Sequence, residues 1–306
     1  MSGRLALLCP GQGFQSPAMF DLARTDPAAA ALLDAWFADP ALVPALRAAI
    51  SGDGFANRVA QPSIVAATLA LWTALGRPRA ALVAGYSIGE LSAYAVAGAL
   101  DPGDAVRLAQ ERARLMDACL AGGEAQAMVA LSGLPEDGAR ALLERFGFHA
   151  AIVTGEDALV AGGPAVQAEA LAAAALALGA RATILPVAVA SHTPLLRGAV
   201  APFADLLARQ RWAAPAAPVL SGISAEPVHD AARALVELPR QIAEPIRWRE
   251  CMDACAEAGI TVALELGPGA ALARMLQARH PGIACRSVAE FRSLAGIHAW
   301  LERQLE

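Results

Sequence analysis

Short apolar runs alternate with longer segments of helical periodicity along most of this chain. Consecutive parallel strands need a crossover connection, usually a helix, so this alternation favours an α/β fold with a mainly parallel sheet. The runs expected to form strands are 5–9, 80–85, 182–189, 219–221 and 261–266. Helices are expected at 62–75, 88–100 and 102–119, and the last begins with Asp101 as N-cap and Pro102 at its first helical position.

The segment 125–189 has a different order of elements. It predicts strand, helix, two strands, helix and strand, which is the βαββαβ order of a ferredoxin-like unit. The expected elements are 127–131, 136–146, 150–153, 158–161, 165–179 and 183–187. We therefore expect a core formed by 1–124 and 190–306, with a small ferredoxin-like subdomain inserted at 125–189 and a hinge at Gly122 and Gly123.

The composition excludes several classes of protein. Hydrophobic residues make up 56% and charged residues 17% of the 306 residues, which is incompatible with intrinsic disorder. A formal net charge of −5 provides no basic surface for a nucleic acid partner. The sequence contains no lysine, so a lysine Schiff base and a phosphate-loop lysine are excluded.

The sequence predicts neither a membrane span nor a secretory signal. The apolar runs at 64–76 and 170–180 are shorter than the roughly 20 residues that cross a bilayer, and the run at 5–9 is too short for a signal peptide. The five cysteines are scattered and form no CxxC pair, which is typical of free thiols in a reducing compartment. We therefore expect a cytoplasmic protein without a membrane partner or a metal site.

Gly85-Tyr86-Ser87-Ile88-Gly89 follows an expected strand and precedes an expected helix. A GxSxG pattern in that position predicts a sharp turn that exposes the serine at the carboxyl edge of the sheet. The helix N-terminus brings unpaired N–H groups and a partial positive charge beside the hydroxyl. Ser87 is therefore the candidate nucleophile, and the alternative is a purely structural turn.

A serine nucleophile needs a base, and His192 is the best placed of the five histidines. It follows the expected strand 182–189 and precedes Thr193 and Pro194, a pattern typical of a helix start. We expect it at the carboxyl edge of the sheet, where ligands bind in open α/β folds. The alternative is a helix-capping or core histidine. The turn at 10–13 follows the first strand and is a second candidate source of N–H donors.

Arg112 lies on the apolar face of the expected helix 102–119. Its neighbours three and four residues away are Leu108, Ala109, Leu115 and Met116. A guanidinium that faces inward stays charged, so it needs an anion. One alternative is a structural pair with a buried carboxylate such as Glu90 or Glu265. The other is bidentate binding of a substrate carboxylate, which together with a serine acyl site predicts an acyl group with a free carboxylate.

These elements together resemble the malonyl-CoA:acyl-carrier-protein transacylase family over nearly the whole chain. GYSIGE at 85–90 is similar to the family's GHSxGE motif, and Arg112 with Met116 resembles its Arg-x-x-x-Met helix. The other similar elements are the GQG loop at 11–13, Gln61-Pro62 opening a core helix, the Ser191-His192 turn, the QxxxPVxW-like stretch 241–248 and the ExGPG loop at 265–269. Their common order argues strongly against coincidence.

The resemblance implies a hydrolase-like α/β core with the ferredoxin-like insert described above. It implies Ser87 as nucleophile, His192 as base and Arg112 as the group that binds the substrate carboxylate. It also implies the backbone N–H groups of Gln12 and Ile88 as the oxyanion hole. In this family a backbone carbonyl near the residue matching Gln241 orients the histidine. Considered alone, Gln241 would be assigned to a helix surface.

The resemblance further implies a ping-pong transfer through a malonyl-serine intermediate. The substrates are malonyl-CoA, a coenzyme A thioester, and the phosphopantetheine thiol of an acyl carrier protein. No metal or tightly bound cofactor is needed. Carrier proteins are typically acidic, so we expect an arginine patch to dock them, with Arg197, Arg209 and Arg211 as candidates.

Two positions depart from the family's pattern. Tyr86 replaces the usual histidine beside the nucleophile, and Thr154-Gly155 stands where a loop with asparagine is expected. Tyr86 and the tail 291–294 are similar to transferases that load the carrier subunit of malonate decarboxylase. That role is therefore an alternative to fatty-acid or polyketide synthesis. The context 189–192 leaves open whether a 2-methyl branch is admitted.

Two other classes stand as alternatives. A serine esterase or thioesterase would use water as acceptor and usually has an acidic triad member between the nucleophile and the histidine. The aspartates between Ser87 and His192 belong to the helix that carries Arg112 or to the small segment, and none follows an expected core strand. A non-catalytic docking scaffold would have no need of an intact serine and histidine pair.

Overall fold

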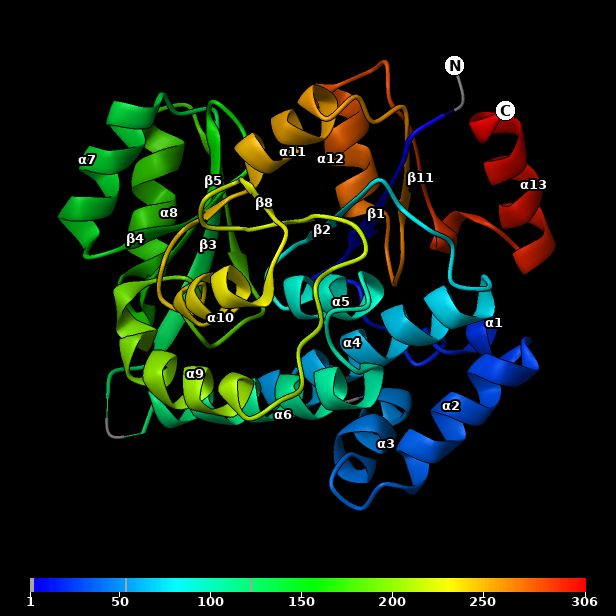
Figure 1. The fold of residues 1–306 in the computed structure, drawn as a ribbon. Helices are drawn as coiled ribbons and strands as arrows, with labels where there is room; N and C mark the ends of the chain where they lie inside the picture. The colour runs from blue at the N-terminus through cyan, green and yellow to red at the C-terminus, as the bar shows by residue number, and fades with distance from the viewer. Residues whose placement is uncertain (1–2, 53, 122) are drawn as a thin grey trace.

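Two sheets organise the chain, and the helices pack around them (Figure 1). The computed structural model describes residues 3–52, 54–121 and 123–306, so Gly122 of the expected hinge lies outside the described residues. The predicted α/β class is confirmed, because one sheet is mostly parallel and the other is mainly antiparallel.

The core sheet has the strand order β11-β10-β1-β2-β7-β8. Its strands are β1 (Leu5–Cys9), β2 (Leu82–Gly85), β7 (Val219–Leu220), β8 (Pro227–Val228), β10 (Val262–Glu265) and β11 (Ala284–Ser287). Neighbours from β11 to β7 are parallel, and β8 runs antiparallel to β7. β1, β2 and β10 are buried along their whole length, which explains their continuous apolar sequences.

The second sheet has the strand order β6-β3-β5-β4-β9. Its strands are β3 (Gln126–Ser132), β4 (His149–Val153), β5 (Ala158–Pro164), β6 (Arg181–Leu185) and β9 (Ile246–Arg247). β3 is antiparallel to both β5 and β6, and β4 is antiparallel to β5, as the ferredoxin-like order predicts. β9 pairs with β4 in parallel, so this sheet extends beyond the segment 125–189. The division into a core and a subdomain stays a prediction.

The helices connect and cover these sheets. They are α1 (Asp21–Arg24), α2 (Pro27–Ala38), α3 (Val43–Ser51), α4 (Asn57–Ala74), α5 (Gly89–Val96), α6 (Pro102–Ala118), α7 (Glu136–Phe146), α8 (Ala168–Ala177), α9 (Val200–Ala208), α10 (Ala231–Arg240), α11 (Trp248–Glu257), α12 (Ala271–Arg279) and α13 (Leu294–Leu305). Short 3₁₀ helices are η1 (Ala165–Gln167), η2 (Pro194–Ala199) and η3 (Val288–Glu290). Among the described residues, no single helix has both the length and the apolar composition of a membrane span.

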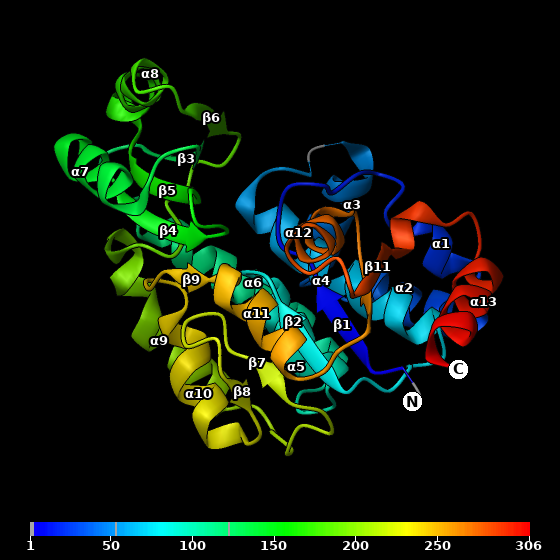
Figure 2. The ribbon, with the colours of Figure 1, turned by 90° about the horizontal axis from the view of Figure 1, so that it is seen from above.

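The second sheet lies beside the core sheet and carries α7 and α8 on its outer face (Figure 2). Alternate side chains of β3 explain this arrangement, because Val129 and Leu131 pack with α7 and α8. Met128 faces the opposite way, into the cluster that contains Trp248 and Met252 of α11. The inner face of the second sheet therefore packs against the core.

The helix that carries Arg112 forms as its sequence predicts. The Asp101 carboxylate accepts hydrogen bonds from the N–H groups of Gly103 and Asp104, at 2.8 and 3.2 Å, and Pro102 is the first helical residue. Both features satisfy or remove N–H groups that the first helical turn leaves unpaired. α6 then runs to Ala118, so the predicted position of Arg112 on its apolar face is retained.

Three predicted elements differ in the structure. The strand predicted at 182–189 is β6, which ends earlier, at Leu185, and lies in the second sheet, where the ferredoxin-like order places its last strand. The helix predicted at 88–100 ends at Val96, because Gly98 adopts a left-handed φ of 75° and closes the helix. The predicted helix 62–75 begins earlier, at Asn57, and contains Pro62 in its interior.

Candidate active site

Ser87 occupies a strained turn between β2 and α5. Its φ of 56° lies in the left-handed region, which is unusual for a residue with a side chain. The flanking glycines make this turn possible. A Cβ at Gly85 would lie 2.2 Å from the backbone nitrogen of Glu90, and one at Gly89 would lie 2.1 Å from the carbonyl oxygen of Cys9. The GxSxG prediction of a sharp strand-to-helix turn is therefore confirmed as geometry.

His192 lies against this serine. Ser87 Oγ and His192 Nε2 are 2.8 Å apart, although the two residues are 105 positions apart in the chain. On the other side of the ring, Nδ1–H donates to the carbonyl oxygen of Gln241 at 2.5 Å. A carbonyl oxygen only accepts, so Nδ1 carries the proton and Nε2 is left to accept the serine proton.

The protonation state of His192 follows from its burial. The residue is 1% exposed, and burial lowers its pKa to about 3, with the positive charge of Arg112 acting in the same direction. The imidazole is therefore neutral at neutral pH. Its place differs from the sequence expectation. It follows a strand of the second sheet, and a loop with a φ of 63° at His192 brings it to Ser87.

Two backbone N–H groups belong to segments next to the serine. Ile88 is the N-cap of α5, and Gln12 lies in the loop after β1. Within the described part of the chain, neither N–H donates a hydrogen bond. The loop touches the elbow, because a Cβ at Gly11 would lie 2.7 Å from the carbonyl oxygen of Tyr86 and 3.4 Å from Ser87 Cβ. Two donors beside the serine can stabilise an oxyanion.

Arg112 is 2% exposed and is held by two neutral amides. Nη1 donates to Gln61 Oε1 at 2.8 Å and Nη2 donates to Gln241 Oε1 at 3.1 Å. In the residues that the structure describes, no carboxylate oxygen lies within 4.0 Å of its guanidinium, so the alternative of a direct pair with Glu90 or Glu265 is wrong. Burial lowers its pKa to about 10, which still leaves the group charged at neutral pH.

Gln241 joins the serine, the histidine and the arginine. It caps the end of α10 and is 1% exposed, so the assignment to a helix surface is wrong. Its side-chain Nε2 donates to the carbonyl oxygen of Ser87 at 3.1 Å and to Glu90 Oε2 at 2.6 Å. Sequence reasoning assigned Gln61 no contact with this site and considered Glu90 only as a direct partner of Arg112, because residues far apart in the chain give no local signal of their contact.

Other residues singled out in the sequence lie around the site or away from it. The Tyr86 ring packs edge-on against Trp248, with centroids 5.2 Å apart. Thr154 and Gly155 lie in the turn between β4 and β5. Among the candidate docking arginines, Arg197 is exposed on η2, which begins two residues after His192.

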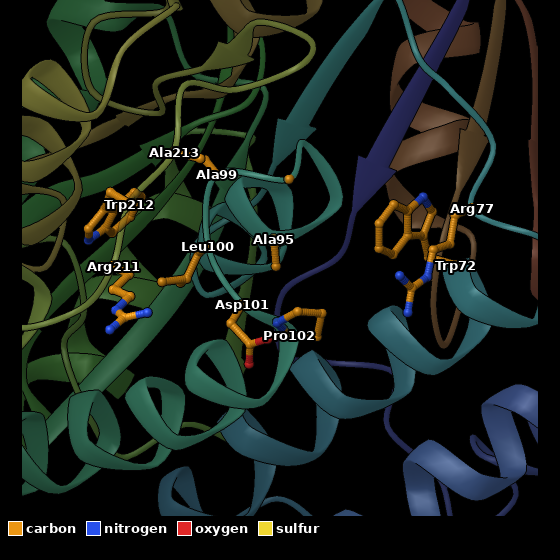
Figure 3. Close-up of a pocket in the computed structure, with 11 residues that line it drawn as sticks. Trp72, Arg77, Ala95, Ala99, Leu100, Asp101, Pro102, Arg211, Trp212 and Ala213 are labelled. Atoms are coloured by element: carbon orange, nitrogen blue, oxygen red, sulfur yellow. The ribbon is translucent and has the colours of Figure 1, made fainter.

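A pocket at the far end of α5 is separate from this site (Figure 3). Its lining includes Ala95 and Ala99 from the C-terminal end of α5 and its exit, with Arg77 and Arg211 from two other segments. α5 has 8 residues, so at 1.5 Å per residue its two ends lie roughly 12 Å apart. Arg211 is therefore remote from Ser87, and this pocket is not where the acyl group would bind.

Comparison with known proteins agrees with the resemblance seen in the sequence. The acyl transferase domain family matches residues 6–281. The malonyl CoA-acyl carrier protein transacylase of Mycobacterium bovis is 35% identical over 292 residues, covering 93% of this chain and 96% of that relative.

Solved structures show the same relationship across the whole chain. The malonyl CoA-acyl carrier protein transacylase from Coxiella burnetii has a TM-score of 0.90 at 27% identity and covers 100% of this chain and 99% of its own. A malonyl-transacylase solved in complex with its type II polyketide acyl carrier protein has a TM-score of 0.88 at 26% identity, covering 98% and 99%. The chain therefore belongs to the malonyl-CoA:acyl-carrier-protein transacylase family of acyl transferases.

Proposed function

We propose that this chain transfers a malonyl group from malonyl-CoA to the phosphopantetheine thiol of an acyl carrier protein. The observation that carries the proposal is the charge of Arg112, buried beside a serine–histidine pair and without a carboxylate partner among the described residues. Malonyl differs from acetyl by a carboxylate, which is the anion that such a guanidinium lacks.

In the first half-reaction, Ser87 attacks the thioester carbonyl while His192 Nε2 takes the hydroxyl proton. The 2.8 Å contact between Oγ and Nε2 supports this transfer. The N–H groups of Gln12 and Ile88 stabilise the oxyanion of the tetrahedral intermediate. His192 then returns the proton to the coenzyme A sulfur, the C–S bond breaks, and malonyl remains on the serine as an ester.

In the second half-reaction the roles are reversed. The phosphopantetheine thiol gives its proton to His192 and its sulfur attacks the malonyl ester. The oxyanion returns to the same two N–H groups, and Ser87 leaves with the proton from His192. The backbone carbonyl of Gln241 keeps the imidazole in one tautomer throughout, as the hydrogen bond to Nδ1 supports.

Arg112 supplies the selectivity for a diacid half-thioester. Its N–H groups that are not bonded to Gln61 and Gln241 are available for two parallel hydrogen bonds to the malonyl carboxylate. A neutral acyl chain in the same place would leave a buried cation without an anion, which is costly. We propose that the reaction needs no metal or tightly bound cofactor, since these side chains carry each step.

The carrier protein partner and the compartment follow from this activity. The related malonyl-transacylase was solved with its acyl carrier protein, and exposed Arg197 near His192 is a docking candidate for an acidic carrier. All five cysteines are free thiols, which supports a reducing, cytoplasmic compartment. The malonate decarboxylase role rests on Tyr86 and the tail 291–294 alone, and the comparisons give it no specific support.

The esterase alternative is less well supported by this site. The contact of His192 Nδ1 is with a backbone carbonyl and not with a triad carboxylate. In an esterase that acts on neutral acyl groups, the buried charge of Arg112 would also have no substrate partner.

Intact-mass spectrometry tests the proposal. After mixing with malonyl-CoA, the parent protein is expected to gain one malonyl group, and Ser87→Ala is expected to gain none. Ser92→Ala is the matched control, because Ser92 is a buried serine on α5, the helix that follows Ser87, and is not in the site. A malonyl adduct that persists in Ser87→Ala would end the assignment of the nucleophile. Release of free malonate without transfer to the carrier thiol would favour the esterase.

A further inference from the structure

Glu90 is a buried carboxylate that the proposed reaction does not use. It is the second residue of α5 and is 1% exposed. Its Oε2 accepts hydrogen bonds from the backbone N–H of Gly222 at 2.9 Å and from Gln241 Nε2 at 2.6 Å. Burial of a carboxylate has a free-energy cost even when it is hydrogen-bonded, which suggests that these contacts have a role in the site.

The side-chain amide of Gln241 lies between a donor and two acceptors. Arg112 only donates, whereas the Glu90 carboxylate and the Ser87 carbonyl accept. All of these contacts are satisfied when Oε1 faces Arg112, at 3.1 Å, and Nε2 faces Glu90 and Ser87, at 2.6 and 3.1 Å. A rotated amide would place its NH₂ group against the guanidinium. Glu90 makes the shorter of the two contacts that prevent this rotation.

The other amide that holds Arg112 is arranged in the same way. Gln61 Oε1 accepts from Arg112 Nη1 at 2.8 Å, while Gln61 Nε2 donates to Asn57 Oδ1 at 2.6 Å. In both cases a second acceptor holds the NH₂ group and turns the amide oxygen toward the guanidinium. Glu90 thus orients the amide of Gln241 from its far side without occupying the N–H groups of Arg112 that a substrate carboxylate would need.

We propose that Glu90 is a positioning residue for acyl-group selection: it fixes the amide of Gln241 and thereby holds Arg112 ready for the malonyl carboxylate. This inference rests on the proposed function. The inference goes beyond the proposed function, because it assigns part of the acyl selectivity to a residue that touches neither the acyl group nor the reacting atoms. The chemistry at Ser87 does not require Glu90, so its loss should affect malonyl more than acetyl.

Single-turnover acylation of Ser87 measures this difference. Each variant is mixed with malonyl-CoA or with acetyl-CoA over a range of concentrations, and the acyl-enzyme is followed by intact mass. Glu90→Met removes both acceptor oxygens at similar length, and Glu90→Gln keeps one oxygen for Gln241. In Glu90→Met, we expect the malonyl-to-acetyl ratio of kcat/KM to fall about tenfold or more, mainly through KM. Glu90→Gln should keep the ratio within about threefold of the parent.

Glu265→Met is the matched control. Glu265 is also 1% exposed and accepts a backbone N–H, from Ala273 at 2.9 Å, but it has no contact with Gln241. It should leave the ratio unchanged, whatever it does to the melting temperature. If Glu90→Met does not fold, Glu90→Asp decides, because it withdraws the carboxylate by about 1.5 Å and should also lower the ratio.

The outcomes separate the two proposals. A ratio unchanged in folded Glu90→Met, or in Glu90→Asp if that variant has to decide, overturns the positioning role. So do equal losses for malonyl and acetyl, which a merely structural role would produce. A parent protein that forms no malonyl adduct would instead overturn the proposed function. The absence of an adduct in the parent distinguishes this outcome from a failure of the positioning role of Glu90, in which the parent is malonylated.

Discussion

Replacing Arg112 by methionine tests the basis of acyl selection. The substitution removes the guanidinium and keeps an unbranched chain of comparable packing in α6. In the parent protein, two of the guanidinium nitrogens bond to Gln61 and Gln241, and the remaining N–H groups have no hydrogen-bond partner among the residues that the structure describes. The variant keeps Ser87 and His192 but offers no positive charge to the acyl group.

The magnitude follows from the burial of the arginine. Removal of one partner of a buried, hydrogen-bonded charge pair costs about 2–5 kcal/mol. At about 1.4 kcal/mol per tenfold, kcat/KM for malonyl transfer should fall about 30-fold to about 4,000-fold. Acetyl has no carboxylate, so its transfer should change by less than about tenfold. The loss of donors to the two amides also destabilises the fold, and removal of a buried charge partly offsets this.

The assay compares malonyl-CoA and acetyl-CoA as donors with a carrier protein thiol as acceptor. Arg114→Met is the matched control, because Arg114 lies on the same helix with 54% of its side chain exposed and pairs with Glu111. It should leave both activities unchanged. Losses of equal size for malonyl and acetyl in Arg112→Met would refute the reasoning and assign Arg112 a structural role.

Three further predictions concern the elbow, the base and the capped helix. The low pKa of His192, about 3, keeps the base neutral in mild acid, so the rate of serine acylation should stay constant as the pH falls from 8 to about 5. A fall in this rate centred near pH 6.5, the pKa of an exposed histidine, would contradict the burial of His192. Gly89→Ala places a Cβ 2.1 Å from the carbonyl oxygen of Cys9 and should abolish serine acylation. The control is Gly138→Ala in α7, where a Cβ meets nothing within 4 Å, and it should raise the free energy of unfolding by about 0.4–1 kcal/mol in a urea titration. Asp101→Ala removes the N-cap of α6 and should lower the same free energy by about 0.5–2 kcal/mol, with an unchanged value counting against the cap.

Local patterns predicted the features that depend on neighbouring residues. The elbow at 85–89 follows from glycines whose absent side chains allow the turn, and the start of α6 follows from Asp101 and Pro102. α7 forms at 136–146 as predicted, because its apolar spacing and its Gly147 C-cap both lie within the segment. Each of these features depends on residues that lie within a few positions of one another in the chain.

Predictions that depended on distant pairing were less successful. The strand predicted at 182–189 ends at Leu185, before Pro186, and its partner is β3 of the second sheet, as the βαββαβ order with its last strand at 183–187 predicts. β9 at 246–247 joins β4 across the boundary of the predicted subdomain. Apolar composition indicates that a strand is buried and does not specify which sheet receives it.

The sequence by itself determined the α/β class, the serine elbow and the inward position of Arg112, because periodicity and turn chemistry act over a few residues. Only the tertiary structure decided what Arg112 touches. Its bonds to Gln61 and Gln241 span 51 and 129 positions, and the bond from Gln241 to Glu90 spans 151. Such contacts depend on how whole elements pack, because a buried donor bonds to the acceptor that this packing brings within hydrogen-bond distance.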